Sequence, residues 1–156
     1  MFEGSQREAL AIFDDFLQSQ SSKVMILTGQ AGTGKTELIS EMVRRAMATR
    51  RSTVLLAPTG QAAERLQRRT GHTASTIHAG IFEFIAPRDR DNDLPPQVVF
   101  GFPAHDPNSP TTLFIIDEAS MISNVGLSDD ERERSEMVFG STNLLADVVS
   151  YCTRDE

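Results

Sequence analysis

The residues of this chain that could do chemistry begin with a glycine-rich loop that runs into Lys35 and Thr36. A short apolar run, residues 24–28, precedes the loop, and apolar residues at helical spacing follow it. The stretch Gly29–Thr36 fits the phosphate-binding pattern G-x(4)-G-K-[ST]. Glycines let the backbone take positive φ and approach a polyphosphate closely, and the N–H groups at the start of the next helix attract anions. The sequence therefore predicts a nucleotide-binding loop.

Each residue of this loop has an expected part in holding a nucleotide. Lys35 is expected to reach the β- and γ-phosphates of ATP, and the Thr36 hydroxyl is expected to bind Mg²⁺. The backbone of the remaining loop residues is expected to line the phosphates. These cofactor-binding residues are Gly29, Ala31, Gly32, Thr33 and Gly34. The loop thus predicts ATP and Mg²⁺ as cofactors.

Two adjacent carboxylates supply the partner that a phosphate-binding loop requires. Asp117 and Glu118 come directly after the apolar strand predicted over residues 112–116. Asp117 is expected to hold Mg²⁺, directly or through water, opposite Thr36. Glu118 is expected to act as general base on a water in line with the γ-phosphate. A carboxylate pair is also a common solvated strand end, so its combination with the loop is what makes Lys35 and Glu118 candidate catalytic residues.

The elements that must position these groups alternate between strands and helices. Strands are predicted over residues 24–28, 53–57 and 112–116. Helices are predicted from an N-cap at Ser5 with Glu8 closing a capping box, after the phosphate loop, between Gly60 and a C-cap at Gly71, and around residues 144–149. This alternation indicates an α/β fold of the P-loop NTPase class, with a parallel sheet flanked by helices.

Three further segments carry weaker signals. Residues 72–85 look partly helical around 77–84. Residues 86–110 hold six of the seven prolines, which predicts an irregular excursion with a short strand over 98–100. The charge run over residues 127–136 is most simply a solvated or mobile loop.

Composition bounds the class of protein. A length of 156 residues suits one domain, and no apolar stretch approaches the roughly 20 residues of a membrane span. The lone Cys152 fits a reducing compartment and is expected to be a buried small hydrophobe, so a cytoplasmic protein is expected. The net charge of −7 argues against a surface that coats nucleic acid, but residues 1–70 carry 10 basic and 7 acidic side chains, which leaves room for a local basic face.

Four segments in order resemble one family. Gly29–Thr36, Ala57–Ala63, Thr76–His78 and Asp117–Ser120 are similar to motifs I, Ia, Ib and II of superfamily-1 DNA helicases of the RecD and Dda type. The resemblance covers most of residues 5–122 and implies an N-terminal RecA-like ATPase domain. It further implies an ATP-dependent translocase on single-stranded DNA, with 5′→3′ polarity in the full-length protein.

The resemblance also assigns residues that spacing does not. Gln6 matches the glutamine that such helicases place on the adenine edge, and Pro58, Thr59, Gly60 and His78 would lie near the DNA backbone. A Thr hydroxyl and a free loop N–H are ordinary phosphate donors. On the residues alone, Thr59 reads equally well as a helix N-cap, and His78 as an interior histidine.

One departure from the family pattern shapes the expectations for this chain. Family members continue past motif II with a further strand, which inserts between the phosphate-loop strand and the motif II strand, and with a second RecA-like domain that supplies an arginine finger. Neither is found before Glu156, so we expect a fragment with a sheet incomplete at its C-terminal end. Such a fragment is expected to bind DNA weakly, to hydrolyse ATP poorly, and to self-associate through open sheet edges.

Two other functions fit the phosphate loop. One is a small-molecule kinase, although the acidic second half offers no basic lid for an acceptor phosphate. The other is a nucleotide-binding module that does not act on DNA. Stimulation of ATP hydrolysis by single-stranded DNA separates a helicase from both.

Overall fold

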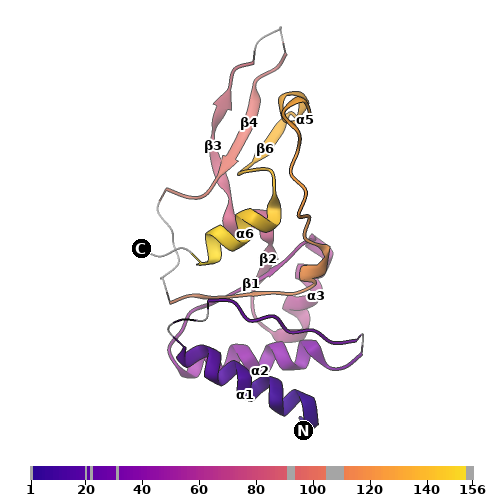
Figure 1. Ribbon diagram of the computed structural model, residues 1–156, viewed down its shortest axis with the longest axis vertical. Coiled ribbons are helices and arrows are strands. Elements are labelled where there is room, and N and C mark those ends of the chain that lie inside the picture. The colour runs from indigo at the N-terminus through magenta and orange to yellow at the C-terminus, as the bar shows by residue number, and fades with distance from the viewer. Residues whose placement is uncertain are drawn as a thin grey trace.

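The computed structural model describes residues 2–19, 21, 23–30, 32–90, 94–104 and 111–153. The chain folds into an elongated molecule with a helical end and a β-hairpin end (Figure 1). Its helices are α1 Gly4–Gln18, α2 Lys35–Ala48, α3 Gly60–Thr70, α4 Ile77–Ile81, the 3₁₀ turn η1 Ala119–Met121, α5 Asp129–Arg134 and α6 Leu144–Thr153. Its strands are β1 Thr53–Ala57, β2 Ala74–Thr76, β3 Glu83–Arg88, β4 Gln97–Gly101, β5 Leu113–Ile116 and β6 Met137–Phe139.

A parallel three-stranded sheet in the order β2-β1-β5 forms the centre of the α/β part. Strand β1 pairs with β2 from Leu55 opposite Ala74, and with β5 from Thr53 opposite Leu113. Three residues of β1 are buried, as a strand covered on both faces requires. The predicted α/β fold with a parallel sheet is confirmed.

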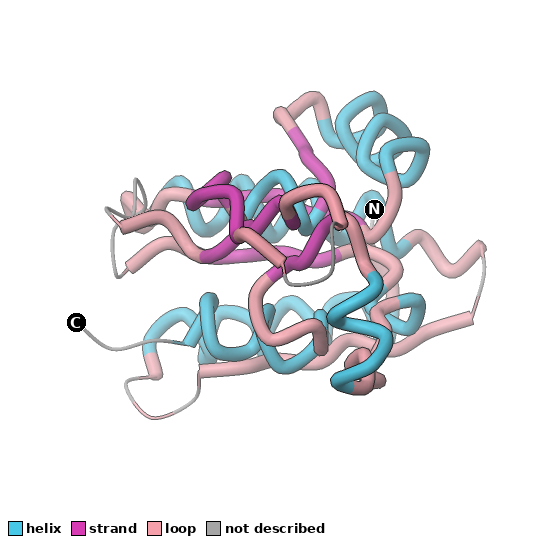
Figure 2. Tube along the Cα trace, turned by 90° about the horizontal axis from the view of Figure 1, so that it is seen from above, coloured by secondary structure: helices cyan, strands magenta, loops and turns pink. Residues whose placement is uncertain are grey.

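Helices cover both faces of this sheet, because its side chains alternate between two cores. Leu55 packs with residues of α2 and α3, whereas Leu56 packs with residues of α4 and α6. Leu113 of β5 joins the core formed by α1 and α2. Viewed from above, helices lie on either side of the strands (Figure 2). The sheet is therefore a rigid support whose strand ends can position a site.

The predicted strand over residues 24–28 is extended but pairs with none of the described strands. Met25 and Leu27 pack against the core of α1 and α2, whereas Val24 is 59% exposed and Ile26 82% exposed. This alternation is that of a strand with one covered face. The prediction of a sheet strand is wrong in one respect: no ladder forms, because no neighbouring strand lies beside the segment in the part of the chain that the structure describes.

The proline-rich stretch contains an ordered β-hairpin. Strands β3 and β4 pair antiparallel, β4 pairs parallel with β6, and the hairpin extends away from α1 and α2 (Figure 1). Pro87 is tolerated because β3 is an edge strand. The strand expected over residues 98–100 is present within β4, but the pairing with β3 was not predicted; residues 91–93 and 105–110 lie outside the described residues. The helix expected around residues 77–84 ends at Ile81.

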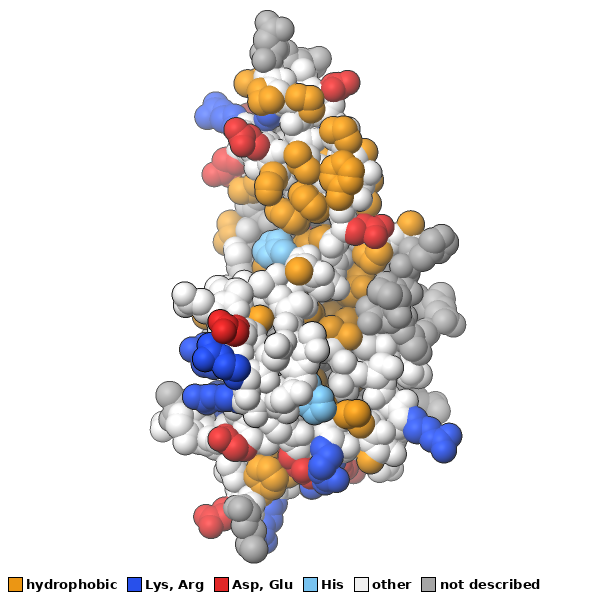
Figure 3. All heavy atoms as spheres, turned by 180° about the vertical axis from the view of Figure 1, so that it is seen from behind, with side chains coloured by type: hydrophobic (Ala, Val, Ile, Leu, Met, Phe, Trp, Pro, Cys, Tyr) orange, Lys and Arg blue, Asp and Glu red, His pale blue; other side chains and the backbone are white. Residues whose placement is uncertain are grey.

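Apolar side chains gather on the surface of this hairpin end when the molecule is seen from behind (Figure 3). Phe84 and Ile85 of β3 are 56% and 52% exposed, and Met137 of β6 is 47% exposed. Beneath them, rings from different elements stack, with the Phe100 and Phe139 centroids 4.5 Å apart. The strands are thus held together by an aromatic cluster rather than by a large core.

Two helix starts differ from expectation. Helix α1 begins at Gly4 after an N-cap at Glu3, not at Ser5, and the Glu3 N–H donates to Gln6 Oε1 at 3.3 Å. The charge run contains helix α5, with Ser128 as N-cap and Glu131 closing a capping box. No residue of α5 is buried, so the run is solvated as predicted, but it is helical because the cap and the acidic first turn favour a helix start.

None of the helices in the described ranges is long and apolar enough to cross a membrane.

Candidate nucleotide-binding site

The glycine-rich loop has the backbone that its sequence predicts. Gly32 and Gly34 take φ values of 80° and 77°, in the left-handed region that favours glycine. The Lys35 ammonium donates to the carbonyl oxygens of Gly29 and Gln30, both at 2.8 Å, so the loop curls around the lysine head group. Helix α2 starts at this lysine. Ala31 lies outside the described residues.

Gln6 of α1 lies directly against the loop. Its side-chain amide donates to the Thr33 carbonyl oxygen at 2.9 Å. A Cβ on Gly34 would come within 2.7 Å of Gln6 Nε2, and the positive φ of this residue itself favours glycine. The glutamine expected from the resemblance is therefore at the edge of the phosphate loop.

The acidic strand end is anchored to the centre of the sheet. The Asp117 N–H donates to the Leu56 carbonyl oxygen of β1 at 3.0 Å, directly beyond the last residue of β5. Asp117 Oδ1 in turn accepts the Glu118 N–H at 3.0 Å. Glu118 has φ 53° and ψ 37°, a left-handed conformation that is uncommon for a residue other than glycine. The proposed base thus sits on a sharp turn at the C-terminal end of a parallel strand, where ligands of open α/β sheets bind.

Helix α3 joins the two halves of the site through two arginines. Arg65 Nη2 lies 3.6 Å from Glu118 Oε1, and Arg69 Nη1 donates to Thr36 Oγ1 at 3.4 Å. Residues four apart lie on the same face of a helix, one turn from each other. The Thr36 hydroxyl and the Glu118 carboxylate therefore contact successive turns of one face of α3. Sequence reasoning missed both arginines. The available signal was their i, i+4 spacing on a helix whose buried residues are Ala62, Ala63 and Leu66.

The donor set at this site fits Mg²⁺. The Thr36 hydroxyl and the Asp117 carboxylate offer oxygen ligands, which this hard cation prefers, and magnesium usually keeps waters and substrate phosphates as its other ligands. Asp117 is partly exposed, and among the described contacts its carboxylate accepts one hydrogen bond, from a backbone N–H. The carboxylate can therefore reach such a cation.

The residues expected near DNA lie in two places. Thr59 is the N-cap of α3, with its hydroxyl accepting the Ala62 N–H at 3.2 Å, so the capping alternative is confirmed. A Cβ on Gly60 would meet nothing within 4 Å, and Pro58 is partly exposed. The start of α3 is therefore an open surface, and the first N–H groups of the helix have no acceptor within the helix itself.

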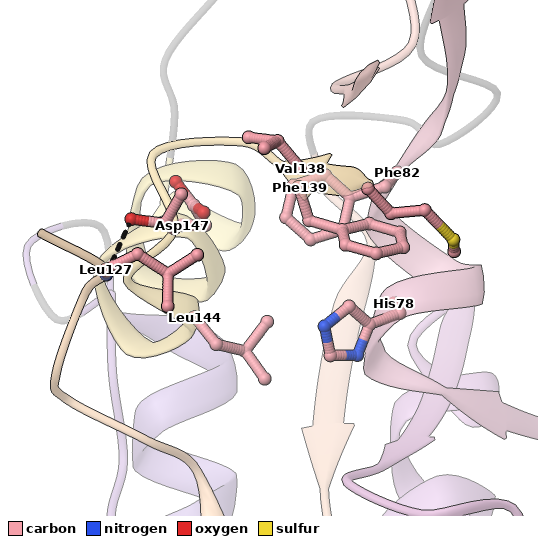
Figure 4. A pocket seen from close by; sticks show the side chains of 9 residues that line it. His78, Phe82, Leu127, Val138, Phe139, Leu144 and Asp147 are labelled. Carbon is pink, nitrogen blue, oxygen red and sulfur yellow. Dashed lines mark hydrogen bonds between the residues drawn. The ribbon is translucent and has the colours of Figure 1, made fainter. Parts of the chain in front are cut away.

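His78 lies in α4, in a pocket of about 120 Å³ between α4, β6 and α6 (Figure 4). Its ring meets the edge of Phe139 at a centroid distance of 4.9 Å and lies 5.9 Å from Phe82. Burial lowers the pKa of this histidine, which favours the neutral imidazole. On the opposite side of the pocket the Leu127 N–H donates to the Thr142 hydroxyl. His78 is thus half-buried among aromatic rings.

Comparisons with known proteins agree with this geometry. Residues 14–128 match the family model described as an AAA domain. The chain is 32% identical over 122 residues to the ATP-dependent RecD2 DNA helicase of Deinococcus radiodurans, an alignment that covers 78% of this chain and 15% of the relative. It is 30% identical over 80 residues to the replication restart protein PriA of Bacillus subtilis, covering 49% of this chain and 10% of that protein. No solved structure matched.

The chain therefore spans less than a fifth of the length of these relatives. The matched region contains the phosphate loop, α3 and the acidic strand end. The resemblance to the ATPase domain of RecD-like superfamily-1 helicases is confirmed, and the chain belongs to the AAA domain family.

Proposed function

We propose that this chain is the ATP-binding motor domain of an ATP-dependent DNA helicase that moves on single-stranded DNA. The observation that carries the proposal is that one face of α3 contacts both Thr36, through Arg69, and Glu118, through Arg65. A hydroxyl after a phosphate-binding lysine and a carboxylate after a neighbouring strand are the two groups that nucleotide hydrolysis needs. The similarity to RecD2 supports DNA as the track.

The roles of the site residues follow from their chemistry. Lys35 binds the β- and γ-phosphates, and the backbone of residues 29–34 cradles them. Gln6 lies at the loop edge, where an amide can read the adenine. Thr36 and Asp117 hold Mg²⁺, which neutralises charge on the phosphate oxygens when bound. Glu118 accepts the proton of the attacking water.

The DNA side of the proposal rests on the start of α3. The backbone N–H groups after Pro58 and Thr59 are suited to a sugar-phosphate chain, whose contacts position the strand and carry no sequence information. His78 is proposed to border the same path. The 5′→3′ polarity is proposed from the resemblance to RecD and Dda proteins alone.

The test is ATP hydrolysis by the protein in its full natural length, with and without oligodeoxythymidylate. Turnover is expected to rise when the oligonucleotide is added. This stimulation should diminish as the salt concentration rises, because DNA binding through phosphate contacts releases counterions. Glu118→Gln is expected to lose hydrolysis while retaining ATP binding, because the amide cannot take a proton. Glu133→Gln, on the solvated helix α5, is the matched control and should behave as wild type. Turnover that DNA does not change would favour a kinase, and ATP binding without turnover would favour a passive nucleotide-binding module.

A further inference from the structure

Glu118 is held away from a relaxed conformation by its neighbours. Its backbone is left-handed, its N–H is committed to Asp117, and its carboxylate pairs with Arg65 at 3.6 Å. A non-glycine residue keeps such a backbone only when the surrounding contacts hold it there. Arg65 therefore competes with an attacking water for one oxygen of the proposed base.

Arg65 is also accessible from outside. Its side chain is 55% exposed and that of Glu118 is 45% exposed. It lies on α3, whose first turn is the open surface at Thr59 and Gly60. Figure 3 shows several basic side chains, with acidic ones among them, on the half of the molecule away from the hairpin. A phosphate group that approaches α3 can therefore compete with Glu118 for this guanidinium.

We propose that Arg65 is a positioning residue that holds Glu118 in a resting orientation until a backbone phosphate of single-stranded DNA draws the arginine away. The inference rests on the proposed function and adds a mechanism by which DNA would stimulate hydrolysis. Half-exposed ion pairs contribute little free energy, so a ligand phosphate can displace this one readily. Arginine is suited to the exchange because its planar fork binds carboxylate and phosphate alike.

The experiment compares Arg65→Ala with wild type in the full-length protein, by steady-state ATP hydrolysis with and without oligodeoxythymidylate. The DNA-independent kcat is expected to rise about 1.5- to 5-fold, the range that follows from the usual strength of an exposed pair. The KM for ATP and the DNA-saturated kcat are expected to stay unchanged, so the stimulation factor falls by the same ratio. A merely structural role would lower both rates together.

Arg68→Ala is the matched control. It removes the same charge from the same helix, but its partner is Glu64, 3.1 Å away and one turn earlier on α3. Its DNA-independent kcat should equal that of wild type. Arg65→Gln keeps a polar side chain on α3 and repeats the measurement if the alanine variant yields too little folded protein. An unchanged or lower DNA-independent kcat in both Arg65 variants overturns the inference.

The two proposals fail in different ways. If wild type binds no ATP, or its hydrolysis ignores DNA, the proposed function fails whatever the variants do. If wild type is stimulated by DNA and Arg65→Ala has the same stimulation factor, the proposed function stands and the role of Arg65 is rejected.

Discussion

At the scale of single residues, the site combines groups whose chemistry is local with groups that only packing could supply. The glycines of the loop need positive φ, and they have it. Lys35 donates hydrogen bonds to two loop carbonyl oxygens, and a bound phosphate can take their place as the acceptor. Arg69 lies 33 residues after Thr36 and Arg65 lies 53 residues before Glu118, so nothing in the local sequence ties either arginine to its partner.

Lys35→Ala is predicted to weaken ATP binding, because it removes a charge-assisted hydrogen bond worth about 1.5–3 kcal/mol. Titration calorimetry of the 156-residue chain with Mg·ATP measures the effect. The chain contains one other lysine, Lys23, so Lys23→Ala is the natural control and should bind as wild type. Equal affinities in the two variants, with equal thermal stability, would remove Lys35 from the nucleotide site.

At the scale of elements, helix packing fixes the site through ion pairs as well as through apolar contacts. Glu41 of α2 accepts hydrogen bonds from Arg44 at 2.6 Å and from Arg45 at 2.9 Å, and Arg45 also pairs with Asp14 of α1. Arg45 thus ties α2, which begins at the phosphate loop, to α1, which carries Gln6.

The hydrogen bonds from Arg44 and Arg45 lower the pKa of Glu41 from 4.5 to about 2. A carboxyl whose pKa is depressed by folding stabilises the protein above its unfolded value and loses that contribution as pH falls. Glu41→Gln is therefore predicted to lower the Tm at neutral pH. The difference from wild type should shrink between pH 4.5 and about pH 2.

Thermal unfolding followed by circular dichroism across this pH range measures the effect. Glu64→Gln is the control, because its pair with Arg68 is largely exposed and contributes at most about 1 kcal/mol. A Tm difference that persists unchanged in acid would show that Glu41 acts through packing rather than through its charge.

At the scale of the whole molecule, the sheet has an unfinished edge. Strand β5 pairs with β1 on one side, and among the described residues no strand lies on its other side. The extended residues 24–28 present Val24 and Ile26 to solvent without ladder hydrogen bonds. Open strands with apolar side chains are templates for pairing with another chain.

We predict that the 156-residue chain self-associates through this edge, and that Ile26→Lys reduces the association, because a charge on an open strand blocks pairing. Light scattering over a concentration series measures the mass. Met47→Lys is the control, since Met47 is a similarly exposed apolar residue on α2 at 55%. A monomeric wild type, or equal masses for the two variants, would contradict the prediction.

The sequence by itself determined the local features. The loop backbone follows from its glycines, α3 from its Thr59 cap and Gly71 stop, and α6 from apolar residues at helical spacing, because each depends on contacts a few residues apart. Cys152 was expected to be buried but is only half-buried, against the core that contains Leu56 and Tyr151, and this desolvation raises the pKa of its thiol to about 12. The order of strand and helix was enough to predict a parallel sheet.

Only the tertiary structure decided what depends on distant partners. A segment forms a β-ladder only when another strand lies beside it. Residues 24–28 have no such neighbour among the described residues, whereas the proline-rich stretch supplies parts of both strands of the β3–β4 hairpin. The contacts of Arg65 and Arg69 with the site depend on the docking of α3 against α2, β1 and β2. Such contacts join residues 33 and 53 positions apart, a separation over which sequence periodicity carries no information.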